Sequence, residues 1–236
     1  MAYGVLLQGV GRTREYINTG WPLFERFPLA PLYAYRRMFM FWNSGRLADA
    51  DRQIDRSIEL WPRHPAIWFS KLWLLSMTER APAALAMIDD VEAWPSTLSA
   101  QHAAGIRISM VALATRRAAD ISAALQANEI AVMKGPTWAI YAIMILTRLG
   151  ELDAAFTIAE GYLLRRGPFA GQLRHTSAQP SVNDQHHRKT MMLFLPSAAP
   201  MRADPRFIDL CRDMGLGNYW RQSGHGPDFL GSRRII

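Results

Sequence analysis

The sequence comes closest to a metal site in one short segment that contains three histidines and an acid. His175, Asp184, His186 and His187 lie close together in it. Adjacent histidines in an extended segment point in opposite directions, and no further cysteine or histidine follows at the spacing of zinc sites. Glycine and proline interrupt the surrounding sequence, which is typical of a loop. We therefore expect a solvated loop, with no metal and no other cofactor.

The other reactive side chains lack the partners that catalysis requires. Cys211 is the single cysteine, and no identifiable histidine–aspartate pair accompanies it, so we expect a buried thiol and not a nucleophile. Asp89, Asp90 and Glu92 lie at the end of an expected helix, where neighbouring carboxylates do not form an acid–base pair by themselves. The sequence contains no phosphate-binding loop, nucleophile elbow or zinc-protease motif. We expect a protein that is not an enzyme.

The basic charge does not form the pattern that nucleic acid requires. The formal net charge is +7, and non-specific binding to nucleic acid needs basic residues gathered on one face. Instead, the arginines form separate doublets, namely Arg36-Arg37, Arg116-Arg117, Arg165-Arg166 and Arg233-Arg234. The charge therefore argues against a nucleic-acid role, and either favours an acidic partner or has no consequence for binding.

Hydropathy and cysteine use indicate the cytoplasm. No stretch approaches the roughly 20 unbroken apolar residues that span a bilayer. The N-terminus has neither a basic segment nor a long apolar one, so we expect no signal peptide. A single cysteine excludes an intrachain disulfide and fits a reducing compartment. We expect a cytoplasmic protein without a membrane span.

A repeat of glycine and proline positions organises the chain. Gly11 is followed by Gly45 after 34 residues, and Pro28 is followed by Pro62 after the same interval. Gly150 opens a stretch, Gly-Glu-Leu-Asp-Ala-Ala-Phe, that is similar to the one after Gly45. A period near 34 is that of a unit made of two helices and a turn.

The clearest copy covers residues 31–64. Proline suits the first turn of a helix, which predicts a first helix from Pro31 to about Trp42. Gly45 then ends this helix, because glycine readily takes the left-handed conformation at a C-terminal cap. A second helix follows, with apolar or small residues at helical spacing that include Ala50 and Ser57, and Pro62 stops it.

The turn glycine, the small residues of the second helix and the terminal proline resemble the consensus of the tetratricopeptide repeat. The resemblance implies an all-α protein, folded as a right-handed α-solenoid of helix-turn-helix repeats with a C-terminal capping helix. Within residues 1–166 the expected copies are about 1–30 (partial), 31–64, 65–95, 96–135 (degenerate) and 136–166. Residues 167–192 are expected to form a loop or linker, and residues 193–236 the C-terminal capping segment.

The first copy is irregular. Only about ten residues precede Gly11, and Gly20-Trp21-Pro22 is predicted to break or delay the second helix. An apolar helix face without a packing partner is a poor end for a solenoid, which needs polar caps. Two interpretations are open: the chain is the C-terminal part of a longer protein, or a short helix serves as an irregular cap.

The tail predicts one further helix. Asp204 and Pro205 begin it, Phe207 lies on its apolar face with Leu210, Cys211 and Met214, and Gly215 ends it. Together with the later Tyr219-Trp220 and Pro227-Asp228-Phe229, this string resembles the C-terminal ends of bacterial tetratricopeptide proteins. Many of those carry a winged-helix DNA-binding domain or a nucleotide-cyclase domain before the repeats. The resemblance implies a sensor or regulatory region without its output domain.

The family's groove positions fall on the first helix of each pair. They are Tyr35, Phe39, Trp42, Phe69, Trp73, Met77, Ile140, Met144 and Arg148. A groove rich in aromatic and methionine side chains suits an apolar peptide or helix. The same residues are alternatively ordinary core, or are covered by the chain's own terminal segments. We expect a non-catalytic scaffold that binds a partner protein, through an acidic or apolar peptide, and the regulatory region named above is the alternative.

Overall fold

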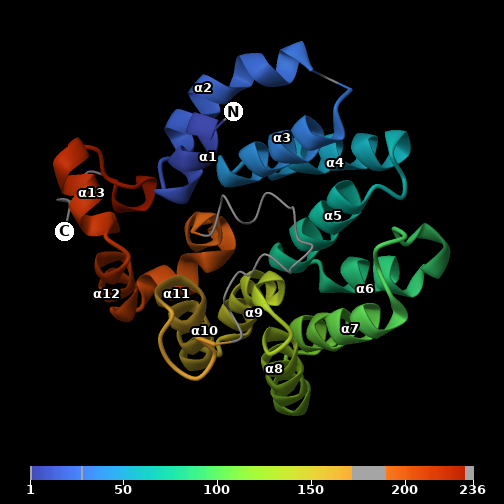
Figure 1. Ribbon diagram of the computed structural model, residues 1–236. Helices are drawn as coiled ribbons and strands as arrows, with labels where there is room; N and C mark the ends of the chain where they lie inside the picture. Colours follow the sequence, from blue (N-terminus) through green and yellow to red (C-terminus); the bar gives the residue numbers. More distant parts are fainter. Residues whose placement is uncertain (1, 28, 172–189, 232–236) are drawn as a thin grey trace. The chain divides into compact units, whose positions relative to one another are not determined.

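The computed structural model describes residues 2–27, 29–171 and 190–231 (Figure 1). In these ranges every regular element is a helix and no strand is present, which confirms the all-α prediction. In the same ranges, no helix combines the length and the apolar character that crossing a membrane requires.

Ten α-helices follow one another along the first part of the described chain. They are α1 (Ala2–Gly9), α2 (Thr13–Arg26), α3 (Pro31–Asn43), α4 (Leu47–Leu60), α5 (Pro65–Met77), α6 (Ala81–Asp89), α7 (Ala100–Thr115), α8 (Ala118–Val132), α9 (Pro136–Leu149) and α10 (Leu152–Ala159). Helices α3, α5, α7 and α9 begin at intervals of 34, 35 and 36 residues. The two helices expected for the clearest copy are present as α3 and α4. Their arrangement as a right-handed solenoid stays a prediction.

The turns between paired helices require one residue in the left-handed conformation. Gly45 supplies it after α3, with a φ of 77°. The next two copies have no glycine there, and Glu79 and Arg116 adopt φ angles of 61° and 56°. For residues with a side chain this conformation costs roughly 1–2 kcal/mol each. The Arg116 guanidinium lies 3.5 Å from the Glu79 carboxylate, so an exposed ion pair joins the two strained turns.

Helix α2 runs unbroken through Pro22, so the prediction that Gly20-Trp21-Pro22 would break or delay it was wrong. Proline removes the hydrogen bond that its N–H would donate to the carbonyl four residues earlier. That carbonyl belongs to Asn18, which is exposed, so water can satisfy it. The helix therefore loses one bond without leaving a buried polar group.

The chain divides into two compact units. Unit 1 consists of residues 1–16 and 125–236, and unit 2 of residues 17–124. The boundaries fall inside α2 and α8, so both connections between the units are helical. This division differs from the expected segments, because the first 16 residues group with the C-terminal segment and not with the repeats that follow them.

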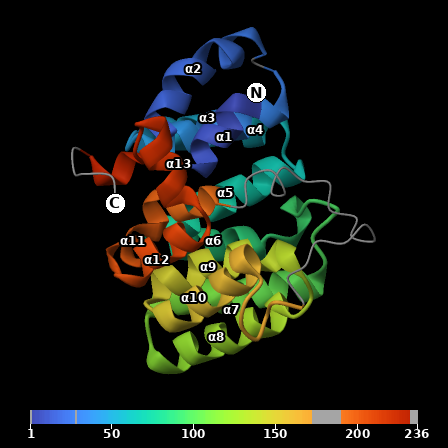
Figure 2. The ribbon, with the colours of Figure 1, turned by 60° about the vertical axis from the view of Figure 1, so that its left-hand side comes forward.

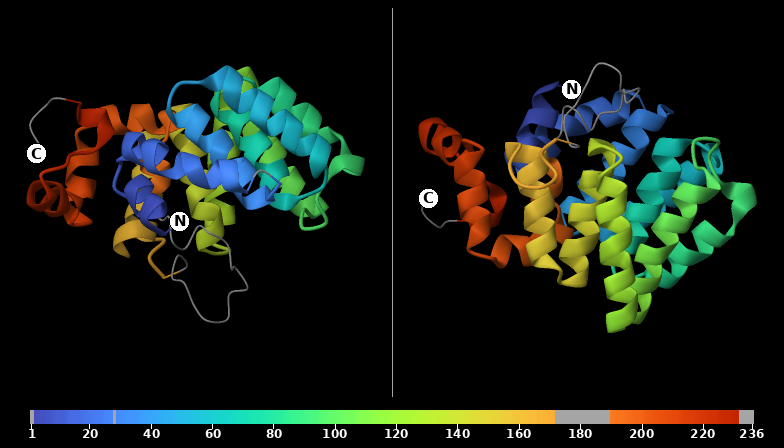
Figure 3. Two further views of the ribbon diagram at one scale, coloured as in Figure 1. Left: turned by 90° about the horizontal axis from the view of Figure 1, so that it is seen from above. Right: turned by 60° about the horizontal axis from the view of Figure 1, so that its bottom comes forward.

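Unit 2 is held together by helices packed side by side. Helix α3 packs on α4 and α5, and α6 packs on α5 and α7; these are neighbouring blue, cyan and green helices in Figure 3. Trp68 and Leu72 of α5 are almost completely buried, and each contributes roughly 2–3 kcal/mol through its apolar surface. The small residues Ala50 and Ser57 are buried as well, which allows α4 to approach its neighbours closely.

In unit 1, the C-terminal segment packs against the last helix pair. Short helices follow residue 190, namely η4 (Met191–Phe194), η5 (Pro196–Ala198), α11 (Ala199–Ala203), α12 (Arg206–Asp213), α13 (Leu216–Ser223) and η6 (Asp228–Leu230). Elements η5 and α11 contact α9. Arg206 of α12 forms an ion pair with Asp153 of α10 at 2.6 Å and lies over the ring of Phe156. Figure 2 shows α11 and α12 beside α9 and α10.

An aromatic cluster forms the centre of the C-terminal segment. Phe207 and Trp220 are buried, and their rings lie 5.6 and 6.4 Å from the ring of Phe229. Phe194 stacks on Phe229 at 6.1 Å. Large aromatic side chains bury much apolar surface per residue, so a segment this short can hold a core of its own. The expected apolar face of the tail helix is therefore buried here, with Phe207, Leu210 and Cys211 all below 5 % exposed.

Candidate functional site

The expected groove residues of α3 and α5 lie together in unit 2. The ring of Phe39 is 6.3 Å from that of Tyr35, 5.9 Å from that of Trp42 and 6.5 Å from that of Trp73. Separately, the ring of Phe69 lies 5.2 Å from that of Trp68. Four of the nine expected positions thus belong to one aromatic cluster that spans two neighbouring helices.

Most of this cluster is buried. Tyr35 is 9 % exposed, while Phe39, Trp42 and Met77 are each 4 % exposed. Phe69 and Trp73 are partly exposed. Side chains this enclosed pack as core, and only Phe69 and Trp73 among these six present appreciable surface to a partner. The assignment of the whole set to a binding groove stays a prediction.

The expected groove residues of α9 lie in unit 1, beneath the C-terminal segment. Ile140 and Met144 are buried, and the neighbouring Thr147 hydroxyl lies 4.0 Å from the sulfur of Met201 in α11. Partial burial lowers the pKa of the Arg148 guanidinium through desolvation. Along α9, therefore, the chain's own tail packs on the helix to which the groove positions were assigned.

A pocket opens in unit 2 where α2 meets α3 and the turn after it. Its volume is about 330 Å³, which is at the small end of the range for small-molecule and anchor-residue sites. Its lining consists of Ile17, Asn18, Trp21, Met40, Phe41, Ser44 and Arg46. The pocket therefore combines two aromatic rings and a methionine with two short polar side chains and one cation.

The aromatic walls of this pocket are in contact with two arginines. The rings of Trp21 and Phe41 meet edge to face with centroids 5.7 Å apart. The Arg37 guanidinium carbon lies 5.0 Å from the Trp21 ring centroid and 5.6 Å from that of Phe41. The Arg46 guanidinium lies 4.7 Å from the Phe41 ring. These cation–π contacts hold two positive charges beside an apolar surface.

The carboxylates near the pocket do not balance these charges. Asp49 accepts from Arg46 Nε at 2.6 Å and also pairs with Arg52, so one acid serves two arginines. Over the ranges that the structure describes, Arg37 forms no ion pair with a carboxylate. The pocket and its rim therefore carry excess positive charge.

An exposed apolar patch lies in the same unit, at the connection between α2 and α3. Phe27, Leu29 and Leu32 are 42 %, 71 % and 40 % exposed. The ring of Phe27 stacks on Tyr33 at 5.2 Å, and Arg26 lies over it. Exposed apolar residues that gather in this way are more typical of interaction surfaces than of ordinary solvent-facing ones.

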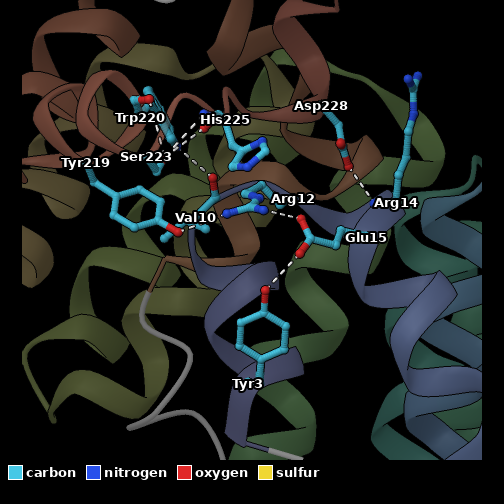
Figure 4. A network of polar contacts seen from close by, with 10 residues as sticks. All are labelled: Tyr3, Val10, Arg12, Arg14, Glu15, Tyr219, Trp220, Ser223, His225 and Asp228. Atoms are coloured by element: carbon cyan, nitrogen blue, oxygen red, sulfur yellow. Dashed lines mark hydrogen bonds and ion pairs between the residues drawn. The ribbon is translucent and has the colours of Figure 1, made fainter.

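A second constellation, in unit 1, joins the α1–α2 turn to the C-terminal segment (Figure 4). Arg12 donates to the Tyr219 hydroxyl at 3.1 Å and pairs with Glu15, and the Tyr3 hydroxyl donates to Glu15 at 2.8 Å. The bond from Tyr3, followed by that from Arg12, lowers the pKa of the Glu15 carboxyl. The same bond raises the pKa of the Tyr3 hydroxyl.

Backbone groups of the same turn are bonded to the tail as well. The Trp220 indole donates to the Val10 carbonyl at 2.9 Å, and the Asp228 carboxylate accepts from the Arg14 N–H at 2.7 Å. In addition, the Asp228 N–H donates to the Gly11 carbonyl at 2.8 Å. These bonds cap the end of α1 and the start of α2. The polar groups of this constellation are thus hydrogen-bonded or ion-paired with one another, and its role is structural. We call this set of contacts between the α1–α2 turn and the C-terminal segment the clasp.

The candidate metal and thiol chemistry can be compared with the structure only in part. His175, Asp184, His186 and His187 lie outside the described residues. Elsewhere in the chain, the described histidine, cysteine and acidic side chains form no group of three or more that would hold a metal ion. Cys211 is buried, and desolvation raises the pKa of its thiol to about 12, so the thiol stays protonated at neutral pH.

The comparisons with known proteins find no match to this chain: no protein-family model, curated protein or solved structure matches it. The chemistry of the pocket therefore has to be inferred from its own side chains.

The sequence interpretation missed this pocket. Trp21 belongs to the tripeptide that is predicted to break the helix, although the spacing of Ile17 and Trp21 places both on one helical face. That spacing is the signal that favours a docked helix. The contact between Trp21 and Phe41 joins residues from two helices, and no local pattern encodes it.

Proposed function

We propose that this chain is a non-catalytic protein-binding module, built from helical hairpins of tetratricopeptide type, that holds a peptide or helix of a partner protein. The observation that supports the proposal most is the pocket between Trp21 and Phe41. Aromatic walls, an adaptable methionine and a few polar groups at the rim are the composition of sites that take an anchor side chain.

The surroundings of the pocket also favour a protein partner. Phe27, Leu29 and Leu32 are exposed in the same unit and offer further apolar surface to a partner. On α5, Phe69 and Trp73 are partly exposed. A peptide or helix makes several contacts spaced along its length, and a set of separate apolar positions suits that mode better than it suits a single small molecule.

Site-specific photo-crosslinking tests this proposal. A benzophenone amino acid replaces Asn18 or Ser44, two exposed residues that line the pocket, in cells that naturally express the protein. We expect a discrete protein adduct from both positions, identified by mass spectrometry. The matched control replaces Arg56, an exposed residue of α4 that does not line the pocket.

The control decides how the adducts are interpreted. Adducts of the same pattern and yield from Arg56 would indicate random collision and contradict the proposal. Absence of any protein adduct at Asn18 and Ser44 would contradict it as well. A folded variant that carries Trp73→Ser then tests the wider groove, because Trp73 is partly exposed whereas Phe39 is core. We expect this change to lower the adduct yield at Asn18 while circular dichroism stays unchanged.

A further inference from the structure

We infer that the pocket between α2 and α3 recognises an acidic peptide segment that carries a bulky apolar side chain. The apolar side chain enters between Trp21 and Phe41, and the flanking carboxylates meet Arg37 and Arg46. This inference rests on the proposed function and names the chemistry of the partner.

The charge of the pocket supplies the first argument. Arg46 lines the pocket and Arg37 lies over its two aromatic rings. Among the described side chains, Asp49 pairs with Arg46 and also with Arg52. The other aspartates of α4 already have cations of their own: Asp51 pairs with Arg80 at 2.8 Å and Asp55 with Lys71 at 2.9 Å. Each aspartate of α4 is therefore paired with a cation other than Arg37. Complementary charge on a partner both speeds encounter and selects against basic competitors.

The placement of Arg37 supplies the second argument. Its guanidinium lies over two aromatic rings, and its Nε is enclosed without a hydrogen-bond partner among the residues with described positions. Contact with the rings restrains the guanidinium, and since its Nε is enclosed, the terminal nitrogens of Arg37 are the groups left to bond a carboxylate. Arg37 is thus held in position before any ligand arrives, which reduces the entropy lost on binding.

The apolar walls of the pocket favour an acidic peptide over a nucleic acid as the partner. Nucleic-acid sites track a backbone with a row of basic residues. Here Arg37 and Arg46 lie over aromatic rings of the pocket wall, while Ile17, Trp21 and Met40 are apolar lining residues. Asn18 and Ser44 at the edge can bond a peptide backbone. A peptide with both apolar and acidic side chains can contact the apolar interior and the arginines. A uniform polyanion would make no contact with the apolar interior.

Nuclear magnetic resonance of methionine methyl groups in the full-length protein tests the inference. The probe is a synthetic peptide of glutamates and aspartates around one central phenylalanine. Met40 lines the pocket, and the Met40→Leu variant assigns its signal. We expect the Met40 signal to shift in a saturable way. Replacing the phenylalanine by serine, or the acids by their amides, should each weaken binding by about tenfold.

Substitutions in the protein sharpen the test. Arg37→Gln and Arg46→Gln are each expected to lower the affinity for the peptide by about 3- to 10-fold, since each removes one charged contact. Arg56→Gln removes an exposed arginine of the same unit and should change affinity by less than about twofold. Thermal unfolding of every variant shows whether the fold is kept, and Arg46→Lys, which retains the charge, should restore part of the binding.

The outcomes separate this inference from the proposed function. A Met40 signal that does not move at saturating peptide overturns the inference, and so does equal loss of affinity in Arg37→Gln and Arg56→Gln. A short RNA that shifts Met40 more strongly than the peptide also overturns it. In each case a protein adduct at Asn18 would leave the protein-binding function standing, with a partner of different chemistry.

Discussion

Two turns of this protein begin with the same dipeptide and differ in what surrounds them. Gly11-Arg12 joins α1 to α2 in unit 1, and Gly45-Arg46 joins α3 to α4 in unit 2. Both glycines are left-handed, with φ angles of 81° and 77°. A Cβ atom on Gly11 would lie 2.8 Å from atoms of Phe194 and Pro227, whereas one on Gly45 would meet nothing within 4 Å.

The arginines that follow differ in the same way. Arg12 is 9 % exposed and is held by Glu15 and Tyr219. Arg46 is exposed and lies beside the pocket, over the ring of Phe41. The repeat thus determines the backbone conformation of the turn, while the residues packed around the turn determine whether its arginine is buried or exposed. One copy of the dipeptide fastens the C-terminal segment, and the other leaves a cation available at the candidate binding site.

The largest difference between the turns is expected from Gly11→Ala. The added methyl group meets the Phe194 ring and Pro227 and also forces alanine into the left-handed region, which together should cost about 3 kcal/mol. Chemical denaturation followed by circular dichroism measures the loss. A cost below about 1 kcal/mol would mean that the C-terminal segment is not packed on this turn.

Removing the cap that the tail provides should have the next largest effect. Asp228→Ala deletes the carboxylate that accepts from the Arg14 N–H, and loss of a helix cap costs about 1 kcal/mol. Since the Asp228 N–H still bonds Gly11, the tail should stay in place. Hydrogen exchange at the start of α2 should rise, and the exchange of α5 in unit 2 serves as the internal control.

Gly45→Ala should cost less than Gly11→Ala. Only the backbone conformation is unfavourable there, because the space around the new methyl group is empty, and the expected loss is about 1 kcal/mol. Denaturation under the same conditions measures it. A cost equal to that of Gly11→Ala would break the comparison, since it would show that the packing around Gly11 contributes nothing.

The smallest effect concerns pH and belongs to the turn of unit 1. The folded state lowers the pKa of Glu15 below its ordinary value of 4.5. The associated stability is present above that value and is lost as the pH falls through the folded-state pKa. Melting temperatures measured from about pH 6 to pH 3 should therefore fall less steeply for Glu15→Gln than for the parent protein.

The same two turns show what the sequence could predict. The helices at residues 31–43 and 47–60 follow from Pro31 and Gly45, because these residues act locally on the backbone. Local signals also predicted the turn at Gly11. They could not predict that the tail encloses it, because the bond from Trp220 to Val10 joins residues 210 apart. Neither interpretation of the irregular first copy included the clasp between the tail and this turn.

The candidate site was predictable to a lesser degree. The repeat pattern assigned aromatic groove positions to α3 and α5, and the rings of Phe39 and Trp73 lie in contact. Pattern could not give their exposure, which depends on everything packed around them. The pocket at Trp21 depends on α2 continuing through Pro22. Helix propensity alone predicts the opposite, because proline is the least favourable residue inside a helix.

Competition at one crosslinking position tests the central claim most directly. The benzophenone side chain at Asn18 is allowed to react with the natural partner in the presence of rising concentrations of the acidic phenylalanine peptide. The account predicts that the protein adduct disappears as the peptide occupies the pocket, and that the serine version of the peptide leaves it intact. An adduct that persists at saturating peptide would contradict the claim that this pocket holds the partner.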